Sequence, residues 1–246
     1  MSKLDDSDEQ IVQSFTRQIQ EIYGEDLISL ILFGSAAGAD YIPERSDLNF
    51  LIVLKEVTPQ QLKKSWRFLN QWHKRGISTP LFLDPKYIHS SVDVYPIEFL
   101  DMQEQHRLLA GDDVLNDLKI SQENLRLQCE QELKGKLLHL RRSYLESGGD
   151  ARRLEELMPA SLKPFGVILR NLLRLHGAQP PQEFLEIINE TERVFNLKLE
   201  AFREVYQLKL GHRRLERTEV EALFESYLHE VQALAQKADA LLKGPK

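Results

Sequence analysis

The sequence predicts an α+β protein, with an N-terminal mixed sheet flanked by helices and a C-terminal α-helical bundle. Two apolar runs, 29–33 and 47–54, lie on either side of a Gly-Ser pair and are typical of buried strands. From about residue 121 onward, apolar residues instead recur at spacings of three and four, as on one face of a helix. A chain of 246 residues, 42% of them hydrophobic, is long enough for two modest domains, which we expect at 1–118 and 119–246.

A helix is expected before the first strand. Ser7 and Gln10 can form a capping box, in which each side chain bonds the backbone of the other residue, and the helical pattern ends at Gly24. The apolar stripe between these ends consists of Ile11, Phe15, Ile19 and Tyr23. The first helix therefore leads directly into the first strand.

A second helix and two short strands are expected after residue 54. Thr58 and Pro59 suit the N-cap and the first helical position, and Gln61 suits a capping box, so this helix should run to about residue 76. Residues 79–83 and 94–102 then carry strand-like patterns. Together these elements predict a small mixed sheet.

The second half is expected to be helical throughout. Its first helix begins near Ser121 and ends at Gly148. The apolar face of this helix is formed by Leu125, Cys129, Leu133, Leu137, Leu140 and Tyr144. Shorter helices are expected at 151–157, 162–176, 183–195 and 198–210. A capping box of Thr218 and Glu221 predicts the start of the last helix.

Composition limits the surfaces, the kinds of site and the cellular location that are expected. A formal net charge of −6 argues against a general nucleic-acid surface but leaves room for a small basic pocket. The single Cys129 excludes an internal disulfide and a cysteine-cluster zinc site. No apolar run reaches membrane-spanning length, and the N-terminus lacks the apolar core of a signal peptide, so a cytoplasmic protein is expected.

The most informative stretch is Asp47-Leu48-Asn49, at the start of the second predicted strand. Side chains alternate between the two faces of a strand, so Asp47 and Asn49 should share a face. The first strand ends at Gly34 and Ser35, and eleven residues separate Ser35 from Asp47. Two oxygen-bearing side chains are therefore expected beside a sharp Gly-Ser turn.

This arrangement resembles the nucleotidyltransferase superfamily typified by DNA polymerase beta and the aminoglycoside nucleotidyltransferases. The signature of that superfamily is an apolar strand ending in Gly-Ser, a spacer, an acid-apolar-acid strand, and a third acid on a later strand. Gly34, Ser35 and Asp47 match it, whereas Asn49 replaces the second acid. The resemblance implies that Gly34 and Ser35 bind the triphosphate where a helix begins, and that Asp47 and the third acid hold Mg²⁺ or Mn²⁺. Asn49 would then be a neutral ligand.

The third acid is expected within residues 92–102. Three apolar-acid-apolar triplets occur there, centred on Asp93, Glu98 and Asp101. Glu98 is the preferred candidate because it lies in the middle of the best strand pattern. An acid on an edge strand facing solvent is the alternative, and Pro96 permits an edge position.

Three function classes follow. The first is nucleotidyl transfer from a nucleoside triphosphate to an unidentified acceptor, with Asp47 and Glu98 as catalytic residues. The second is a catalytically inactive protein of the same fold that binds a nucleotide or a partner, which the neutral Asn49 favours. The third is ribonuclease activity, because Arg170 and His176 resemble the Arg-polar-x4-His motif of HEPN-type ribonucleases. They lie about 240° apart around a helix and would need a homodimer to meet.

Overall fold

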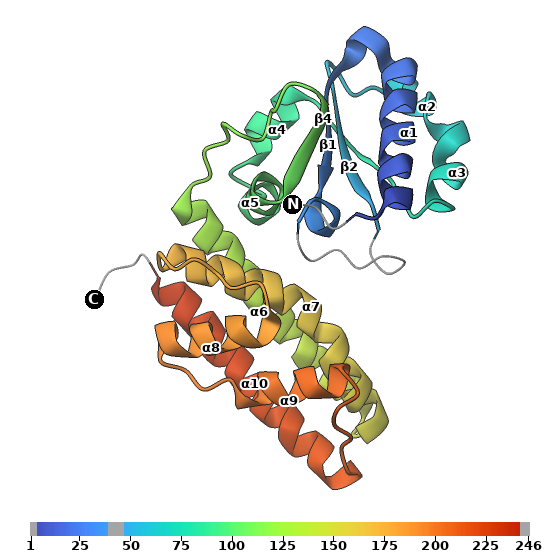
Figure 1. Ribbon diagram of the computed structural model, residues 1–246. Helices are drawn as coiled ribbons and strands as arrows, with labels where there is room; N and C mark the ends of the chain where they lie inside the picture. Colours follow the sequence, from blue (N-terminus) through green and yellow to red (C-terminus); the bar gives the residue numbers. More distant parts are fainter. Residues whose placement is uncertain (1–3, 39–46, 242–246) are drawn as a thin grey trace. The chain divides into compact units, whose positions relative to one another are not determined.

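The computed structural model describes residues 4–38 and 47–241, and it divides into two compact units, Met1–Ile120 and Ser121–Lys246. The first unit is a four-stranded sheet with helices on both faces (Figure 1). The second unit consists of helices. Among the described residues, no helix is both long enough and apolar enough to cross a bilayer.

The sheet has the strand order β3-β2-β1-β4. Its strands are β1 (Leu27–Phe33), β2 (Asn49–Leu54), β3 (Leu81–Leu83) and β4 (His106–Gly111). β1 pairs antiparallel with both β2 and β4, whereas β2 pairs parallel with β3. At the end of β1, Phe33 lies opposite Asn49 on one side and His106 on the other. This end of the sheet is where the predicted site lies.

Helix α1 (Asp6–Tyr23) covers one face of the sheet (Figure 1). The predicted helix is present, but its N-cap is Asp5, whose carboxylate accepts from the amide of Asp8, and not Ser7. The residues buried from α1 are Val12, Phe15, Ile19 and Tyr23. They pack against side chains of β1 and β2 that point to this face, so burial of an apolar stripe fixes α1 on the sheet.

The helix expected up to residue 76 is divided into three short pieces, α2 (Pro59–Lys63), η3 (Trp66–Phe68) and α3 (Leu69–His73). Thr58 caps α2 as predicted, since its hydroxyl accepts from the amide of Gln61. The Gln61 side chain does not close a capping box but donates to Asp26.

Residues 94–102 do not form the predicted strand, because 96–102 lie in a helix. This helix, α5 (Pro96–Glu104), follows α4 (Pro85–Ser91), and both cover the face of the sheet opposite α1 (Figure 1). Pro96 occupies the first turn, where its missing amide hydrogen costs nothing. Phe99 and Met102 are buried against Ile31 of β1. The fourth strand, β4, comes after this helix and was not predicted.

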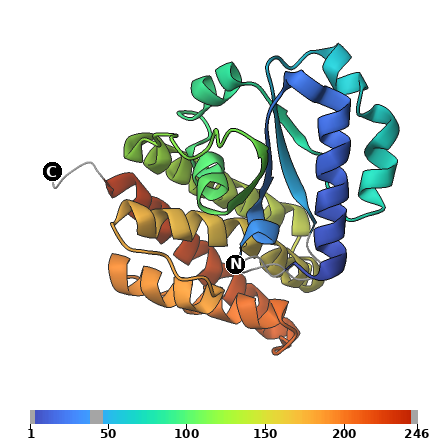
Figure 2. The same cartoon turned by 45° about the horizontal axis from the view of Figure 1, so that its top comes forward.

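The second unit consists of five helices over the part of it that is described (Figure 2). They are α6 (Gln122–Ser147), α7 (Ala151–Leu175), α8 (Phe184–Phe195), α9 (Glu200–Lys209) and α10 (Arg217–Ala240). Ser121 caps α6, and Gly148 ends it in the left-handed conformation, as expected. Cys129 is fully buried on α6. The capping box of α10 is formed by Glu216 and Glu219, two residues before the predicted pair of Thr218 and Glu221.

Helix α7 is continuous where two helices were expected. It contains Pro159 and Pro164, each of which removes one helical hydrogen bond and costs about 3 kcal/mol in a helix interior. Phe165, Leu169 and Leu172 of the same helix are fully buried, and each contributes roughly 1.5–3 kcal/mol by leaving water. Tertiary packing therefore outweighs the local cost of the prolines.

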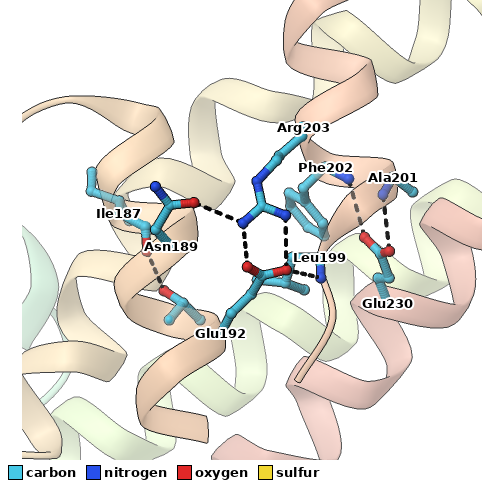
Figure 3. Close-up of polar contacts among 9 residues, drawn as sticks. Ile187, Asn189, Glu192, Leu199, Ala201, Phe202, Arg203 and Glu230 are labelled. Carbon is cyan, nitrogen blue, oxygen red and sulfur yellow. Dashed lines mark hydrogen bonds and ion pairs between the residues drawn. The ribbon is translucent and has the colours of Figure 1, made fainter. Parts of the chain in front are cut away.

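Two carboxylates hold the start of α9 (Figure 3). Glu192 of α8 binds the guanidinium of Arg203 and accepts from the amide of Leu199 at 2.7 Å. Glu230 of α10 accepts from the amides of Ala201 at 2.9 Å and Phe202 at 3.1 Å. Since α9 has no side-chain cap of its own, Glu230 satisfies amides at its N-terminus from a neighbouring helix.

Candidate functional site

The predicted Gly-Ser turn closes β1. Gly34 has φ +74°, a left-handed conformation that favours glycine. Its amide donates to the carbonyl of Gln105 at 2.9 Å, which ties the turn to the residue before β4. Gly34 and Ser35 begin the 3-10 helix η2 (Gly34–Ala37). The helix that the resemblance implies is therefore a single turn of four residues.

Asn49 is held by a hydrogen bond to a neutral group. Its Oδ1 accepts from the hydroxyl of Ser78 at 2.7 Å, and its Nδ2 lies 3.5 Å from the carbonyl oxygen of Asp47. Ser78 is positioned by its own amide, which donates to the carbonyl of Leu48 at 3.1 Å. The amide oxygen that could bind a metal is therefore already engaged by a hydroxyl.

The segment that lies beside Leu48 and Asn49, at the start of β2, carries no acidic side chain. Ile77 bridges to Leu48, so Ser78 is the side chain that adjoins Asn49, and β3 contains only Leu81, Phe82 and Leu83. β4 reads His-Arg-Leu-Leu-Ala-Gly and also lacks a carboxylate. The two described strands that follow β2 thus supply no third acid.

The preferred third acid, Glu98, lies in the first turn of α5 and is exposed. Its predicted placement on a strand was wrong, because Pro96 begins a helix here and Phe99 and Met102 of that helix pack into the core. The alternative Asp101 lies on the same helix, and Asp93 lies in the turn before it. Asp47 is exposed and lies two residues before the start of β2. The assignment of Asp47, Asn49 and Glu98 as metal ligands stays a prediction.

A Mg²⁺ or Mn²⁺ site for two ions needs several carboxylates within reach of one another. Within residues 4–38 and 47–241, no three His, Cys, Asp or Glu side chains lie close enough together to hold a metal ion. The oxygen of Asn49 is engaged by Ser78. The described residues therefore do not fit a two-metal site.

Sequence reasoning missed a polar cluster at the start of β4. The Nδ1 of His106 lies 3.0 Å from the carbonyl oxygen of Gln103, and its Nε2 lies 3.0 Å from Asp113. Asp113 also accepts from the amides of Leu115 and Asn116. Burial acts to raise the pKa of the Asp113 carboxyl, but the bond and charge of His106 and the two amides outweigh it and leave that pKa below its ordinary value. Histidine spacing in the sequence carried no signal of this cluster.

The residues of the ribonuclease-like motif have structural partners in the second unit. Arg170 donates to the carbonyl of Gln182 at 3.2 Å, and the ring of His176 packs edge-on against Phe195. The polar residue of the motif, Asn171, is fully buried and donates to the carbonyl of Val167 within α7. These contacts hold α7 and its C-terminus, and the ribonuclease alternative stays a prediction.

Comparison with solved structures finds a similar architecture. The chain matches the crystal structure of spectinomycin adenyltransferase AAD(9) from Enterococcus faecialis with ATP and spectinomycin, with a TM-score of 0.52. The match covers 94% of this chain and 99% of that chain at 12% identity. The match shows that the chain shares the fold of that adenyltransferase.

The sequence itself matches no protein-family model and no curated protein. At 12% identity the structural match establishes the fold and not the activity. Any activity therefore depends on the residues at the Gly34 end of the sheet.

Proposed function

We propose that this protein binds a nucleoside triphosphate at the Gly34–Ser35 turn and that it does so without efficient nucleotidyl transfer. The observation that carries the proposal is the neutral pair formed by Asn49 and Ser78, at 2.7 Å. It lies where the signature of the fold would place charged metal ligands. The absence of carboxylates from β3 and β4 supports the same conclusion.

The backbone suits an anion. The left-handed φ of Gly34 and its missing side chain let a phosphate approach the turn closely. An ordinary acid-rich site repels a triphosphate unless metal ions neutralise the charge. With an amide and a hydroxyl beside the turn, that repulsion is smaller. Binding should therefore depend little on Mg²⁺.

A second candidate is nucleotidyl transfer, for which Asp47 and Glu98 would have to hold Mg²⁺ or Mn²⁺ with Asn49. Its support is the similar fold of a protein crystallised with ATP and spectinomycin. The acceptor would be a small molecule or a macromolecule. The neutral Asn49–Ser78 pair ranks this candidate below binding alone.

The test is a screen of the four nucleoside triphosphates with Mg²⁺, with Mn²⁺ and with a chelator. We expect calorimetry to detect binding under all three conditions. Pyrophosphate release and nucleotide attachment to the protein itself should be undetectable. Rapid pyrophosphate release would overturn the proposal in favour of the second candidate.

Gly34→Val identifies the turn as the binding site. The variant places a branched side chain at a left-handed position and blocks close approach of phosphate, so nucleotide binding should be lost at this site. Gly211→Val is the matched control, since Gly211 also has φ +74° and lies in the other unit. Both variants should lose similar stability, and only Gly34→Val should lose the nucleotide that binds at the turn. Equal affinity in Gly34→Val and wild type would exclude the turn.

A further inference from the structure

The first unit carries an aromatic hollow on the surface of its α1 side. The hollow has a volume of about 630 Å³ and lies between the C-terminal half of α1 and the segment that forms α2 and η3. Its lining includes Glu21, Lys63, Trp66, Arg67 and Phe68. Trp66 is 63% exposed, which is costly for so large an apolar ring.

Two cations lie over the aromatic rings of this hollow. The Lys63 ammonium is 5.6 Å from the centre of the Trp66 ring, and the Arg67 guanidinium is 4.6 Å from that of Phe68. In the described part of the chain, neither Lys63 nor Arg67 forms an ion pair, whereas the neighbouring Lys64 pairs with Asp26. The hollow therefore offers two cations that form no ion pair, together with the single carboxylate of Glu21.

The exposed ring is held on a fixed support. Ser65, the residue before Trp66, is buried, and its hydroxyl lies 2.6 Å from that of Tyr23. Phe68 stacks on the buried Trp72, whose indole donates to Gln18 at 2.7 Å. Because Ser65 before Trp66 and Phe68 two residues after it are both anchored, the fold holds Trp66 at the surface, and a ligand would find its ring already in place.

We propose that this hollow is a second ligand site, for a nucleoside polyphosphate. The base stacks on Trp66, and the phosphates bind Lys63 and Arg67. A flat aromatic surface beside cations that form no ion pair is complementary to a flat base that carries phosphates. The volume suits a nucleotide, since small-molecule sites measure about 300–1,000 Å³. Glu21 can accept hydrogen bonds from amino or ribose hydroxyl groups.

The net charge of the chain favours a free nucleotide over an extended nucleic acid as the ligand. The protein has a formal charge of −6, so an extended nucleic acid would meet repulsion beyond the hollow. A single nucleotide is small enough to interact mainly with the cations of the hollow. Free nucleotide is therefore the ligand to which the proposal commits.

The site is separate from the Gly34–Ser35 turn. Tyr23 and Asp26 contact Lys64 of the hollow and lie within four residues before β1, whereas Gly34 follows β1. A strand of seven residues spans about 20 Å. The proposal therefore does not rest on nucleotide binding at the turn, and the two sites can fail independently.

Tryptophan fluorescence tests the proposal on the full chain. The chain has two tryptophans, and Trp72 is buried at 1% exposure, so acrylamide-accessible emission comes from Trp66. In the Gly34→Val background, we expect ATP to quench this emission and to shield it from acrylamide. The double variant Lys63→Glu with Arg67→Glu should raise the Kd for ATP at least tenfold. No change in emission up to millimolar ATP would overturn the proposal.

Three controls make the result specific. Lys74→Glu reverses an exposed charge outside the hollow and should leave the Kd unchanged. By calorimetry in the same background, Trp66→Phe should keep most of the affinity and Trp66→Ala should lose it, as stacking requires. Inorganic triphosphate and oligouridylate are compared with ATP. Equal Kd values for triphosphate and ATP would exclude base stacking, and binding of the oligonucleotide without ATP binding would replace the proposal with a nucleic-acid surface.

Discussion

At the residue scale, the chemistry of the site depends on which partner each polar side chain has. Asn49 was recognised from the sequence as the departure from an acid-rich motif, and this assignment needed only local spacing. Its bond to Ser78 joins residues 29 positions apart, and no local pattern announces it. This hydrogen bond ties the Asn49 side chain to the segment beside β2 at the end of the sheet. An acid at this position would meet a hydroxyl and no second carboxylate on β3.

Asn49→Asp tests whether charge alone is missing. The substitution restores a carboxylate at nearly constant volume, and Ser78 can still donate to it. We expect Mn²⁺ affinity to rise about tenfold, worth about 1.4 kcal/mol, with pyrophosphate release remaining slow because β3 and β4 supply no further acid. Manganese binding measured by electron paramagnetic resonance gives the affinity. Asn70→Asp, an exposed change in the same unit, is the control.

A large gain of turnover in Asn49→Asp would contradict the binding proposal, because it would show that the rest of a transfer site is complete. Asp47→Asn is the reverse test. It should remove any metal affinity that the wild type has while leaving chelator-insensitive nucleotide binding intact.

Glu230 makes stability depend on pH. Burial raises the pKa of this carboxyl to about 7, although the amides of Ala201 and Phe202 act to lower it. Because the folded pKa lies above the unfolded value, the folded state binds more protons between about pH 4.5 and pH 7. Stability should therefore fall as pH rises through this window, by at most about 3 kcal/mol and by less after solvent screening.

Glu230→Gln keeps an acceptor for α9 and removes the titration. Urea unfolding at pH 5 and pH 8, followed by circular dichroism, should show a smaller difference between the two pH values in the variant than in wild type. An unchanged difference would mean that Glu230 ionises normally in the folded protein. Glu225→Gln, an exposed change on the same helix, controls for net charge.

At the element scale, α5 and β4 show where prediction from the sequence stops. Residues 94–102 are mainly apolar, and Glu98 and Asp101 each lie between two apolar residues, a pattern that suits a strand locally. The helix forms because Pro96 starts it and because Phe99 and Met102 fill the core over β1. Only tertiary packing distinguishes the two outcomes. The true last strand begins with His106 and Arg107, whose polar side chains hide it.

The pairing of β4 with β1 depends on Gly111. A Cβ there would lie 2.0 Å from the carbonyl oxygen of Ile28, and φ is +79°. We expect Gly111→Ala to lower the free energy of unfolding by about 2–4 kcal/mol, because the backbone must move. Gly76→Ala has a similar φ of +73° with open space around it, so it should cost only about 1 kcal/mol. Urea titrations followed by tryptophan fluorescence measure both, and equal losses would contradict the close approach.

At the scale of the whole molecule, the α+β class and the helical second half were predictable because both depend on strong periodicity. The Gly34–Ser35 turn was predictable because a left-handed position favours glycine, and a glycine that directly follows an apolar run is visible in the local sequence. Continuity of α7 through Pro159 and Pro164 was not, since buried side chains decide it. The structural match covers 94% of the chain, so it includes helical elements that carried no motif.

The placement of rare side chains gives each unit its own spectroscopic or chemical reporter. Both tryptophans belong to the first unit, and the single cysteine, Cys129, is fully enclosed on α6 of the second. A thiol reagent can reach that sulfur only when the helices around it separate, so the rate of labelling measures opening of the helical unit. Indole emission follows the sheet unit in the same sample. Whether ligands that bind near the sheet also steady the helices can thus be measured in the unmodified chain.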